Sequence, residues 1–516
     1  MLTDGQVARG SLDTLECPTS APFSTKDVGK TITITGAGTS VYGKPLVTTI
    51  RAVLSPRRVA LRHPAAHPVR HAHVRWGSDD RAAINRALTA LMTHGGGLML
   101  FPPGHTYYCS STIGSPTQAI GDWINHLTVI GYGATLMSGI VPTGPTGTPP
   151  AMRLSGSNVS VLGLTFDWTT YLDPTDPTLN NSEEGDCLMV GGDAAVPSRV
   201  ASNVLVRDCT FNGAWFAAIR PSFATQVTLD HNRIDRALAT GLFAGELQGS
   251  AAIVHNTILG TGDDAIFVGC GRAVPQTSRV VIAHNTIRNP AAKGIGVGGI
   301  RDVVIQGNLI ENTHAQGIDA EAGGTAWDTV SHLTIADNVL KDVGRNWGPS
   351  GHRYREVSSC PSAIYMSQSN YSFQNVRIEG NQIFNRTAEP YGDGIHVASV
   401  KGLTIAHNRI DHPGTAGISL GARAVPHSVV DFVIAQNHVT GVGKGGPDAF
   451  GTGLVCYNAD GGTIAGNVFE RVGVRAILME GCDRVAVTNN RLVGDRRTGN
   501  LLYAPGCTNL LLDPAP

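Results

Sequence analysis

Four side chains that can exchange protons or hold a charge occur at recurring places in the chain. Asp263 and Asp264 form an adjacent pair after a glycine, and Lys293 and Asp319 follow in the next two segments. Two adjacent carboxylates repel each other, so one can hold a raised pKa and act as a general acid while the other stays ionised. The alternative is that both aspartates are ordinary turn residues. We expect Asp263, Asp264, Lys293 and Asp319 to be catalytic.

Aromatic and polar side chains follow the same recurring pattern. Aromatic faces beside carboxylates suit sugar rings, whose C–H faces are apolar and whose hydroxyls need acceptors. Glu321 shares a strand with Asp319 and could bind hydroxyls, activate water or be solvated. A lone surface histidine is more often incidental, which assigns His396 to binding. The residues that we expect to contact substrate are Arg220, Phe243, Phe267, Glu321, Tyr365, His396 and Trp347.

These side chains lie on short strands that place a small residue before an apolar one, as in Ala265-Ile266 and Gly294-Ile295. We expect the apolar residue to point inward. Because strand side chains alternate and successive coils lie ~4.8 Å apart, the neighbouring residues face outward and stack into columns. The expected inward residues are Leu188, Ile219, Leu242, Ile266, Ile295, Ile318, Ile364, Ile395, Ile418, Leu454 and Ile477.

An asparagine closes an apolar alternation in each segment. Spacings of 20 to 30 residues, with one of 43, are typical of single coils of a parallel β-helix. The asparagines have a structural interpretation, because stacked corner amides can bond to one another and to turn backbone, and asparagine tolerates left-handed geometry. They stand at positions 232, 256, 285, 308, 338, 381, 408, 437, 467 and 490.

The whole pattern predicts an all-β chain dominated by a right-handed parallel β-helix of about 11–13 coils. Short alternating runs before residue 75 predict a small β subdomain over 1–75, and 76–516 would form the β-helix. Residues 79–92 predict a capping helix, followed by a buried strand from Leu98. The extra residues between Ile318 and Ile364, which include Trp347, and the loop 169–184 would wall a long side groove.

The net charge and the cysteine content limit which binding partners and cofactors we expect. A formal net charge of −1 indicates neither nucleic acid nor an anionic membrane as a partner, and slightly favours a neutral glycan, although Arg220, Lys293 and Arg355 could form a local anion site. The nine cysteines show no C-x-x-C pair, and neither a zinc set nor a calcium loop is evident, so we expect no cofactor and no metal. No apolar run is long enough to span a membrane. We expect an extracellular protein, although the chain begins without a signal-peptide pattern.

The sequence resembles the pectate-lyase-like β-helix superfamily, most closely polygalacturonase-type glycoside hydrolases and β-helix proteins of bacterial and phage origin. The resemblance covers about residues 79–500 and rests on Asp79-Asp-Arg-Ala-Ala-Ile-Asn-Arg-Ala-Leu, Gly95-Gly-Gly-Leu-Met-Leu-Phe-Pro-Pro-Gly and Gly262-Asp-Asp-Ala-Ile. It implies acid and base catalysis by carboxylates. Asp263 and Asp264 match the family's aspartate pair, whereas Thr240 replaces a preceding aspartate and Lys293 a following histidine.

Three functions therefore stay open. The first is cleavage of glycosidic bonds in a polysaccharide or oligosaccharide, by hydrolysis or related glycosyl transfer, with Asp319 as a replacement second carboxylate. The second is elimination or epimerisation of a uronate, with Lys293 as the base. The third is glycan binding without catalysis, as in phage tailspikes and adhesins. The chain would act as a monomer or a homotrimer.

Overall fold

The computed structural model describes most of the chain in two compact units. The first unit comprises Met1–Ser222 and His231–Gly241, and the second comprises Phe223–Asp230 and Leu242–Pro516. The described residues are 2–39, 45–114, 123–140, 149–168, 185–192, 199–269, 277–321, 329–344, 362–366, 373–385, 392–423, 425, 428–443, 451–494 and 501–512. Trp347, Arg355 and the loop 169–184 lie outside the described residues.

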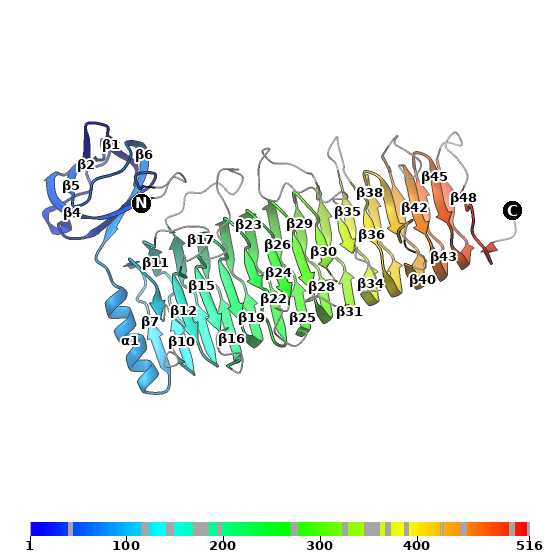
Figure 1. Ribbon diagram of the computed structural model, residues 1–516, viewed down its shortest axis with the longest axis horizontal. Coiled ribbons are helices and arrows are strands. Elements are labelled where there is room, and N and C mark those ends of the chain that lie inside the picture. The colour runs from blue at the N-terminus through cyan, green and yellow to red at the C-terminus, as the bar shows by residue number, and fades with distance from the viewer. Residues whose placement is uncertain are drawn as a thin grey trace. The chain divides into compact units, whose positions relative to one another are not determined.

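The first unit begins with a closed antiparallel β-barrel, which confirms the expected small β subdomain (Figure 1). Its own core includes the fully buried Leu15, Ile32 and Val74. The expected boundary at residue 75 falls within its last strand, and a domain division there stays a prediction. In barrel order the strands are β1 (Leu2–Ala8), β2 (Ser11–Glu16), β5 (Arg58–Leu61), β4 (Leu46–Ser55), β3 (Thr31–Ile34) and β6 (Val69–Gly77), with a short 3-10 helix η1 (Thr25–Asp27).

Helix α1 (Arg81–Thr93) follows the barrel and buries Ile84 and Leu88. The carboxylate of Asp80 precedes the helix and accepts the backbone N–H of Tyr108 at 3.0 Å instead of capping α1. The next strand, β7 (Gly97–Leu100), is only partly buried, contrary to our expectation, and Leu98 and Leu100 are each 59% exposed. A buried strand needs cover on both faces, whereas among the residues of β7 only Met99 is buried.

Parallel strands then form coils, each contributing one strand to each of three sheets. In the first unit the first sheet holds β7, β10 (Leu127–Ile130), β13 (Val159–Leu162) and β16 (Ala201–Arg207). The second sheet holds β8 (Thr106–Cys109), β11 (Thr135–Ser138), β14 (Thr165–Trp168), β17 (Thr210–Ala214) and β20 (Arg233–Ala237). The third sheet holds β9 (Ile113–Gly114), β12 (Met152–Ser155), β15 (Leu188–Gly191) and β18 (Ile219–Ser222).

The second unit continues the same three-sheet pattern, and its coils stack one after another (Figure 1). Its first sheet holds β19 (Ala224–Asp230), β22 (Ala251–Val254), β25 (Thr277–Ala283), β28 (Ile300–Gln306), β31 (Val330–Ala336), β34 (Phe373–Glu379), β37 (Val400–Ala406), β40 (Val429–Ala435), β43 (Ala459–Ala465), β46 (Asp483–Thr488) and β49 (Leu511–Leu512). Its second sheet holds β23 (Thr257–Thr261), β26 (Thr286–Pro290), β29 (Leu309–Glu311), β32 (Val339–Lys341), β35 (Gln382–Phe384), β38 (Arg409–Asp411), β41 (His438–Thr440), β44 (Val468–Glu470) and β47 (Arg491–Val493).

The third sheet of the second unit carries the side chains of interest. It holds β21 (Leu242–Ala244), β24 (Ile266–Gly269), β27 (Ile295–Gly298), β30 (Ile318–Glu321), β33 (Ile364–Met366), β36 (Ile395–Val397), β39 (Ala416–Leu420), β42 (Thr452–Tyr457), β45 (Arg475–Glu480) and β48 (Leu502–Tyr503). The described residues of the two units thus hold more coils than the 11–13 expected, because the coils of the first unit before Asn232 lack the regular asparagine frame.

The asparagines form a buried ladder in the second unit, as expected. Asn308 donates from Nδ2 to the side-chain oxygen of Asn338 at 2.9 Å and to the backbone carbonyl of Ile282 at 2.9 Å, while its own side-chain oxygen accepts the Nδ2 of Asn285 at 3.0 Å. The left-handed backbone falls elsewhere than predicted, on the residue before each asparagine, such as His284 at φ 57°. The asparagine is therefore selected for its amide and the preceding residue absorbs the turn.

Candidate functional site

The register of the third sheet in the second unit agrees with the columns predicted from the sequence. Leu242, Ile266, Ile295, Ile318 and Ile364 pair in succession and are fully buried. The residues that follow them face outward and also pair in succession. This outward column reads Phe243, Phe267, Gly296, Asp319, Tyr365, His396 and Ser419.

Asp264 lies at the corner that leads into β24 and is only 7% exposed. One of its carboxylate oxygens, Oδ1, accepts the backbone N–H of Lys293 on the next coil at 3.1 Å. The other, Oδ2, lies over Gly296, where an added Cβ would come within 2.8 Å of it. The missing side chain at Gly296 thus gives the carboxylate of Asp264 its place beside the outward column.

Lys293 connects the acidic residues of neighbouring coils. Its ammonium nitrogen lies 2.8 Å from Oδ2 of Asp319 and forms a second ion pair with Glu321. The side chain of Asp319 is 6% exposed, whereas that of Glu321 is 40% exposed. The structure therefore brings together Asp264, Lys293, Asp319 and Glu321, which we call the acid–lysine cluster.

Burial governs the protonation of this cluster. It raises the pKa of Asp264 well above its usual range, against the opposing charge of Lys293, while the charge of Asp263 adds to the rise. Burial also raises the pKa of Asp319 to about 6, again opposed by Lys293. For Lys293 burial favours the neutral amine, but the charges of Asp264, Asp319 and Glu321 outweigh it and raise the pKa. The cluster thus combines two carboxyl groups that ionise only above the usual pH range of aspartate with a lysine that stays protonated.

Asp263 differs from its neighbour. It is only partly buried, and its backbone carbonyl accepts the hydroxyl of Thr261 at 2.7 Å. Its charge reaches the cluster by raising the pKa of Asp264. The aspartate pair therefore divides into a buried acid and a half-buried neighbour.

Stacked ring pairs lie on the outward column near the cluster. The rings of Phe243 and Phe267 stack with centroids 5.6 Å apart, and those of Tyr365 and His396 stack at 5.1 Å. All four side chains are partly exposed. These pairs offer flat, partly apolar surfaces of the kind on which sugar rings rest.

Asp393 is a residue that our sequence interpretation did not assign to the site. Its Oδ2 lies 3.1 Å from Nδ1 of His396, and its Oδ1 accepts the backbone N–H of Ala416 at 3.0 Å and the hydroxyl of Thr415. The available signal was its position three residues before His396, in the same column as Asp264. Gly296 was the second omission, because an absent side chain gives no chemical signal.

Arg220 belongs to the first unit, on β18. Its guanidinium lies 3.8 Å from Asp186 and stands over the ring of Phe216 at 5.7 Å. Its proposed contact with substrate stays a prediction. The same holds for Trp347, which lies outside the described residues.

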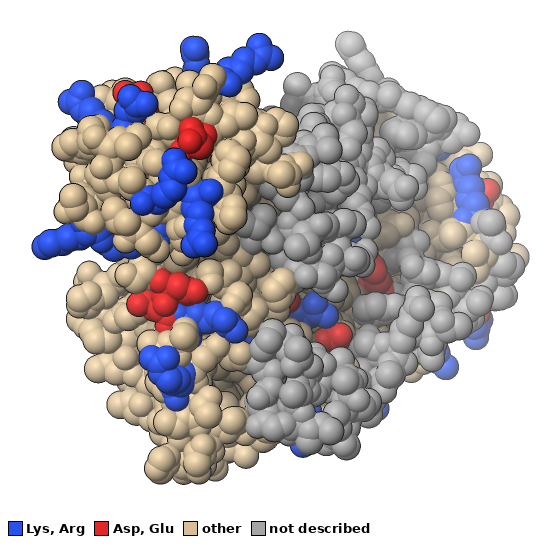
Figure 2. Space-filling view, turned by 60° about the vertical axis from the view of Figure 1, so that its left-hand side comes forward, with Lys and Arg blue, Asp and Glu red and all other residues tan. Residues whose placement is uncertain are grey.

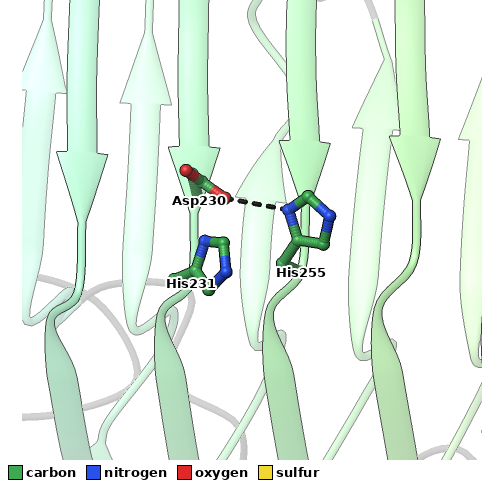
Figure 3. A group of neighbouring side chains, drawn as sticks. All are labelled: Asp230, His231 and His255. Atoms are coloured by element: carbon green, nitrogen blue, oxygen red, sulfur yellow. Dashed lines mark hydrogen bonds and ion pairs between the residues drawn. The ribbon is translucent and has the colours of Figure 1, made fainter.

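Potential metal ligands occur at the end of the first sheet. Asp230 and His255 belong to the one group, among the described residues, whose His, Cys, Asp and Glu atoms are close enough to share an ion (Figure 3). Nδ1 of His255 lies 3.1 Å from Oδ1 of Asp230, and its ring stacks on that of His284. The acid–lysine cluster lies instead beside the third sheet.

The sequence matches a known protein family over much of the region that forms the β-helix. A family model described as right-handed β-helix region matches residues 225–386 and 362–510, together more than half of the chain. No curated protein matched the sequence. No helix within the described residues is long and apolar enough to cross a membrane.

Several solved structures are similar to this chain. The A-module of mannuronan C-5 epimerase AlgE6 from Azotobacter vinelandii has 16% identity and a TM-score of 0.44, over 85% of this chain and 96% of that chain. The catalytic domain of Agl-KA has 14% identity and a TM-score of 0.49, over 94% and 88%. The surface protein and adhesin PfbA from Streptococcus pneumoniae has 16% identity and a TM-score of 0.48, over 84% and 96%.

Proposed function

The chain belongs to the family of right-handed β-helix proteins, and from this premise we propose that it is an enzyme that cleaves glycosidic bonds of a polysaccharide or oligosaccharide. The observation that carries the proposal is the acid–lysine cluster, in which two buried carboxyls with raised pKa values flank one lysine. A carboxyl that stays protonated near neutral pH is what general acid catalysis of glycoside cleavage requires.

The proposed roles follow from the protonation of each group. Asp264, with its pKa held well above the usual range, donates a proton to the oxygen of the leaving sugar. Asp319, whose pKa is about 6, is ionised above that pH and activates the attacking water or sugar hydroxyl. Asp263 supports Asp264 through its charge.

Lys293 acts as a fixed positive charge in this proposal. It holds Asp319 at 2.8 Å and stabilises negative charge on the cluster as the proton leaves Asp264. The alternative role as a base for elimination or epimerisation needs a neutral amine, and the surrounding carboxylates disfavour that form. The stacked pairs of Phe243 with Phe267 and Tyr365 with His396 would support the sugar rings beside the cluster.

The test is a panel of neutral and acidic polysaccharides. Release of reducing ends and absorbance of unsaturated uronates are measured in parallel for the wild type, Asp264→Asn and Asp230→Asn. Asp230 is also 7% exposed but lies on the first sheet, so Asp230→Asn controls for loss of a buried carboxylate. We expect reducing ends without ultraviolet absorbance, a drop of at least a hundredfold in Asp264→Asn, and little change in Asp230→Asn.

Other outcomes would overturn the proposal in distinct ways. Ultraviolet absorbance that depends on Lys293 would establish elimination. Binding of a glycan without formation of any product would show that the protein binds glycans without catalysis. An equal loss in both aspartate variants would show that the activity does not depend specifically on the acid–lysine cluster.

A further inference from the structure

The barrel of the first unit carries a charge that the rest of the chain does not. Residues 1–77 contain ten lysines and arginines against four acidic residues, a formal net charge of +6, whereas the remaining residues carry −7. The chain's total of −1 conceals this division. Figure 2 shows Lys and Arg side chains gathered on the upper left part of the molecule, where the barrel of Figure 1 lies. The barrel is thus a basic module in an otherwise acidic chain.

Part of this charge surrounds a hollow. Strands β1, β2, β5 and β6 meet at a depression of about 600 Å³. Three arginines and one acidic residue contribute charge to it, and the side-chain amide of Gln6 and the hydroxyls of Ser11 and Thr14 line it as well. The charged residues are Arg9, Arg58, Arg70 and Glu16.

The three arginines are available to a ligand. Arg9, Arg58 and Arg70 are exposed, and none of them forms an ion pair or a side-chain hydrogen bond with another of the described residues. Glu16 stands opposite Arg58 in the pairing of β2 with β5 but forms no ion pair with it. Three guanidinium groups thus surround one hollow, and none of them is paired with another of the described residues. Such groups attract carboxylate, sulfate or phosphate groups, which they can bind in a bidentate manner.

We propose that this hollow binds a segment of an anionic polysaccharide. The guanidinium groups of Arg9, Arg58 and Arg70 would hold the acidic substituents, while the hydroxyls and the amide of the lining would bond to sugar hydroxyls. A single-stranded nucleic acid fits less well, because no aromatic side chain lines the hollow to stack on bases. This binding site does not depend on the chemistry proposed for the acid–lysine cluster.

The experiment measures binding of the full chain to immobilised polygalacturonate, with neutral dextran and double-stranded DNA as comparison probes. The variant Arg58→Ser/Arg70→Ser removes two charges from the hollow. The control Arg57→Ser/Arg62→Ser removes two exposed arginines of the same barrel that do not line it. Arg9→Ser, in the turn between β1 and β2, is a single change that preserves the strands.

We expect the wild type to bind polygalacturonate and not dextran, with affinity falling steeply as salt rises. The hollow variant should lose at least tenfold in affinity and Arg9→Ser about threefold, whereas the control should lose no more than twofold. Thermal unfolding of each variant verifies its fold. Equal losses in the hollow variant and the control would overturn the proposal, because the barrel's overall charge would then explain binding. DNA bound as tightly as polygalacturonate, with the same sensitivity, would also overturn it.

Discussion

Lys293 is the positive charge that faces the acidic side chains on the third sheet of the second unit. Its ammonium group pairs with Asp319 and Glu321, while its backbone N–H bonds to Asp264. Removal of the lysine would leave buried carboxylates without a counter-charge, which is among the more costly defects in a protein interior. The charge balance of these acidic side chains thus depends on one lysine that stays protonated.

The pH dependence of activity is a prediction at this scale. Asp319 must be ionised to act as a base, and burial raises its pKa to about 6, so kcat/KM should fall as pH drops through that value. The charge of Glu321 contributes to the raised pKa of Asp319, so Glu321→Gln should move the acid limb to lower pH. A pH profile of kcat/KM for both proteins provides the measurement. An acid limb near pH 4, the ordinary range for aspartate, would contradict the assignment of Asp319.

Gly296 yields a second prediction about a single residue. A Cβ at this position would meet Oδ2 of Asp264 at 2.8 Å and the ring of Phe267 at 3.1 Å. Gly296→Ala should therefore displace the carboxylate and lower kcat at least tenfold, while the free energy of unfolding changes by about 1 kcal/mol or less, since the neighbours are side chains that can shift. Ser419→Ala, on the same outward column, is the control. Unchanged kcat in Gly296→Ala would show that the position of Asp264 does not matter.

At the scale of elements, the asparagine ladder fastens one coil to the next. Each amide in its middle is buried and bonds both to the following asparagine and to a backbone carbonyl. Polar groups buried in this way contribute mainly because their loss leaves partners unsatisfied. The ladder therefore stabilises the corner that precedes the second sheet and holds the coils in register.

We predict that Asn308→Ala destabilises the second unit by about 2–4 kcal/mol, because Asn285 and the carbonyl of Ile282 lose their partners. Asn490→Ala, at the half-buried end of the ladder, should cost clearly less, since water can replace its bonds. Chemical denaturation measures both values. Equal costs at the two positions would contradict the role of burial in the ladder.

At the scale of the whole chain, the two proposed sites lie in parts of opposite charge. The basic barrel would hold an anionic polymer, and the cluster on the third sheet of the second unit would act on it. Electrostatic attraction by exposed arginines is screened by salt, whereas a buried cluster is affected much less. The two sites should therefore respond differently to ionic strength.

If both proposals hold, raising NaCl from about 50 to 300 mM should increase KM for a long anionic substrate several-fold and leave kcat unchanged, because exposed charges are screened at the higher salt. KM for a neutral substrate, which the arginines do not attract, should stay constant. Steady-state kinetics with both substrates at the two salt concentrations provides kcat and KM. The same salt dependence of KM for both substrates would show that the barrel does not contribute to substrate binding during catalysis.

Much of the architecture could be predicted from the sequence because the β-helix repeats itself. Inward residues such as Ile266, Ile295 and Ile318 must alternate with outward ones, and a shift by one residue would expose the whole column to water. The same rule identified Phe267 and Asp319 as outward neighbours. β7 is the exception, because an apolar run such as Leu98–Leu100 does not reveal whether anything covers it.

The sequence by itself determined the fold class, the small β subdomain, the register of the third sheet and the stacking of the asparagines. The tertiary structure alone decided that Asp264 rather than Asp263 is buried, that Lys293 pairs with Asp319 and Glu321, and that Asp393 holds His396. It also gathered three arginines of the barrel around one hollow. The physical reason is that periodicity specifies where backbones lie, whereas burial, side-chain direction and pKa depend on neighbours that corners of irregular length bring together.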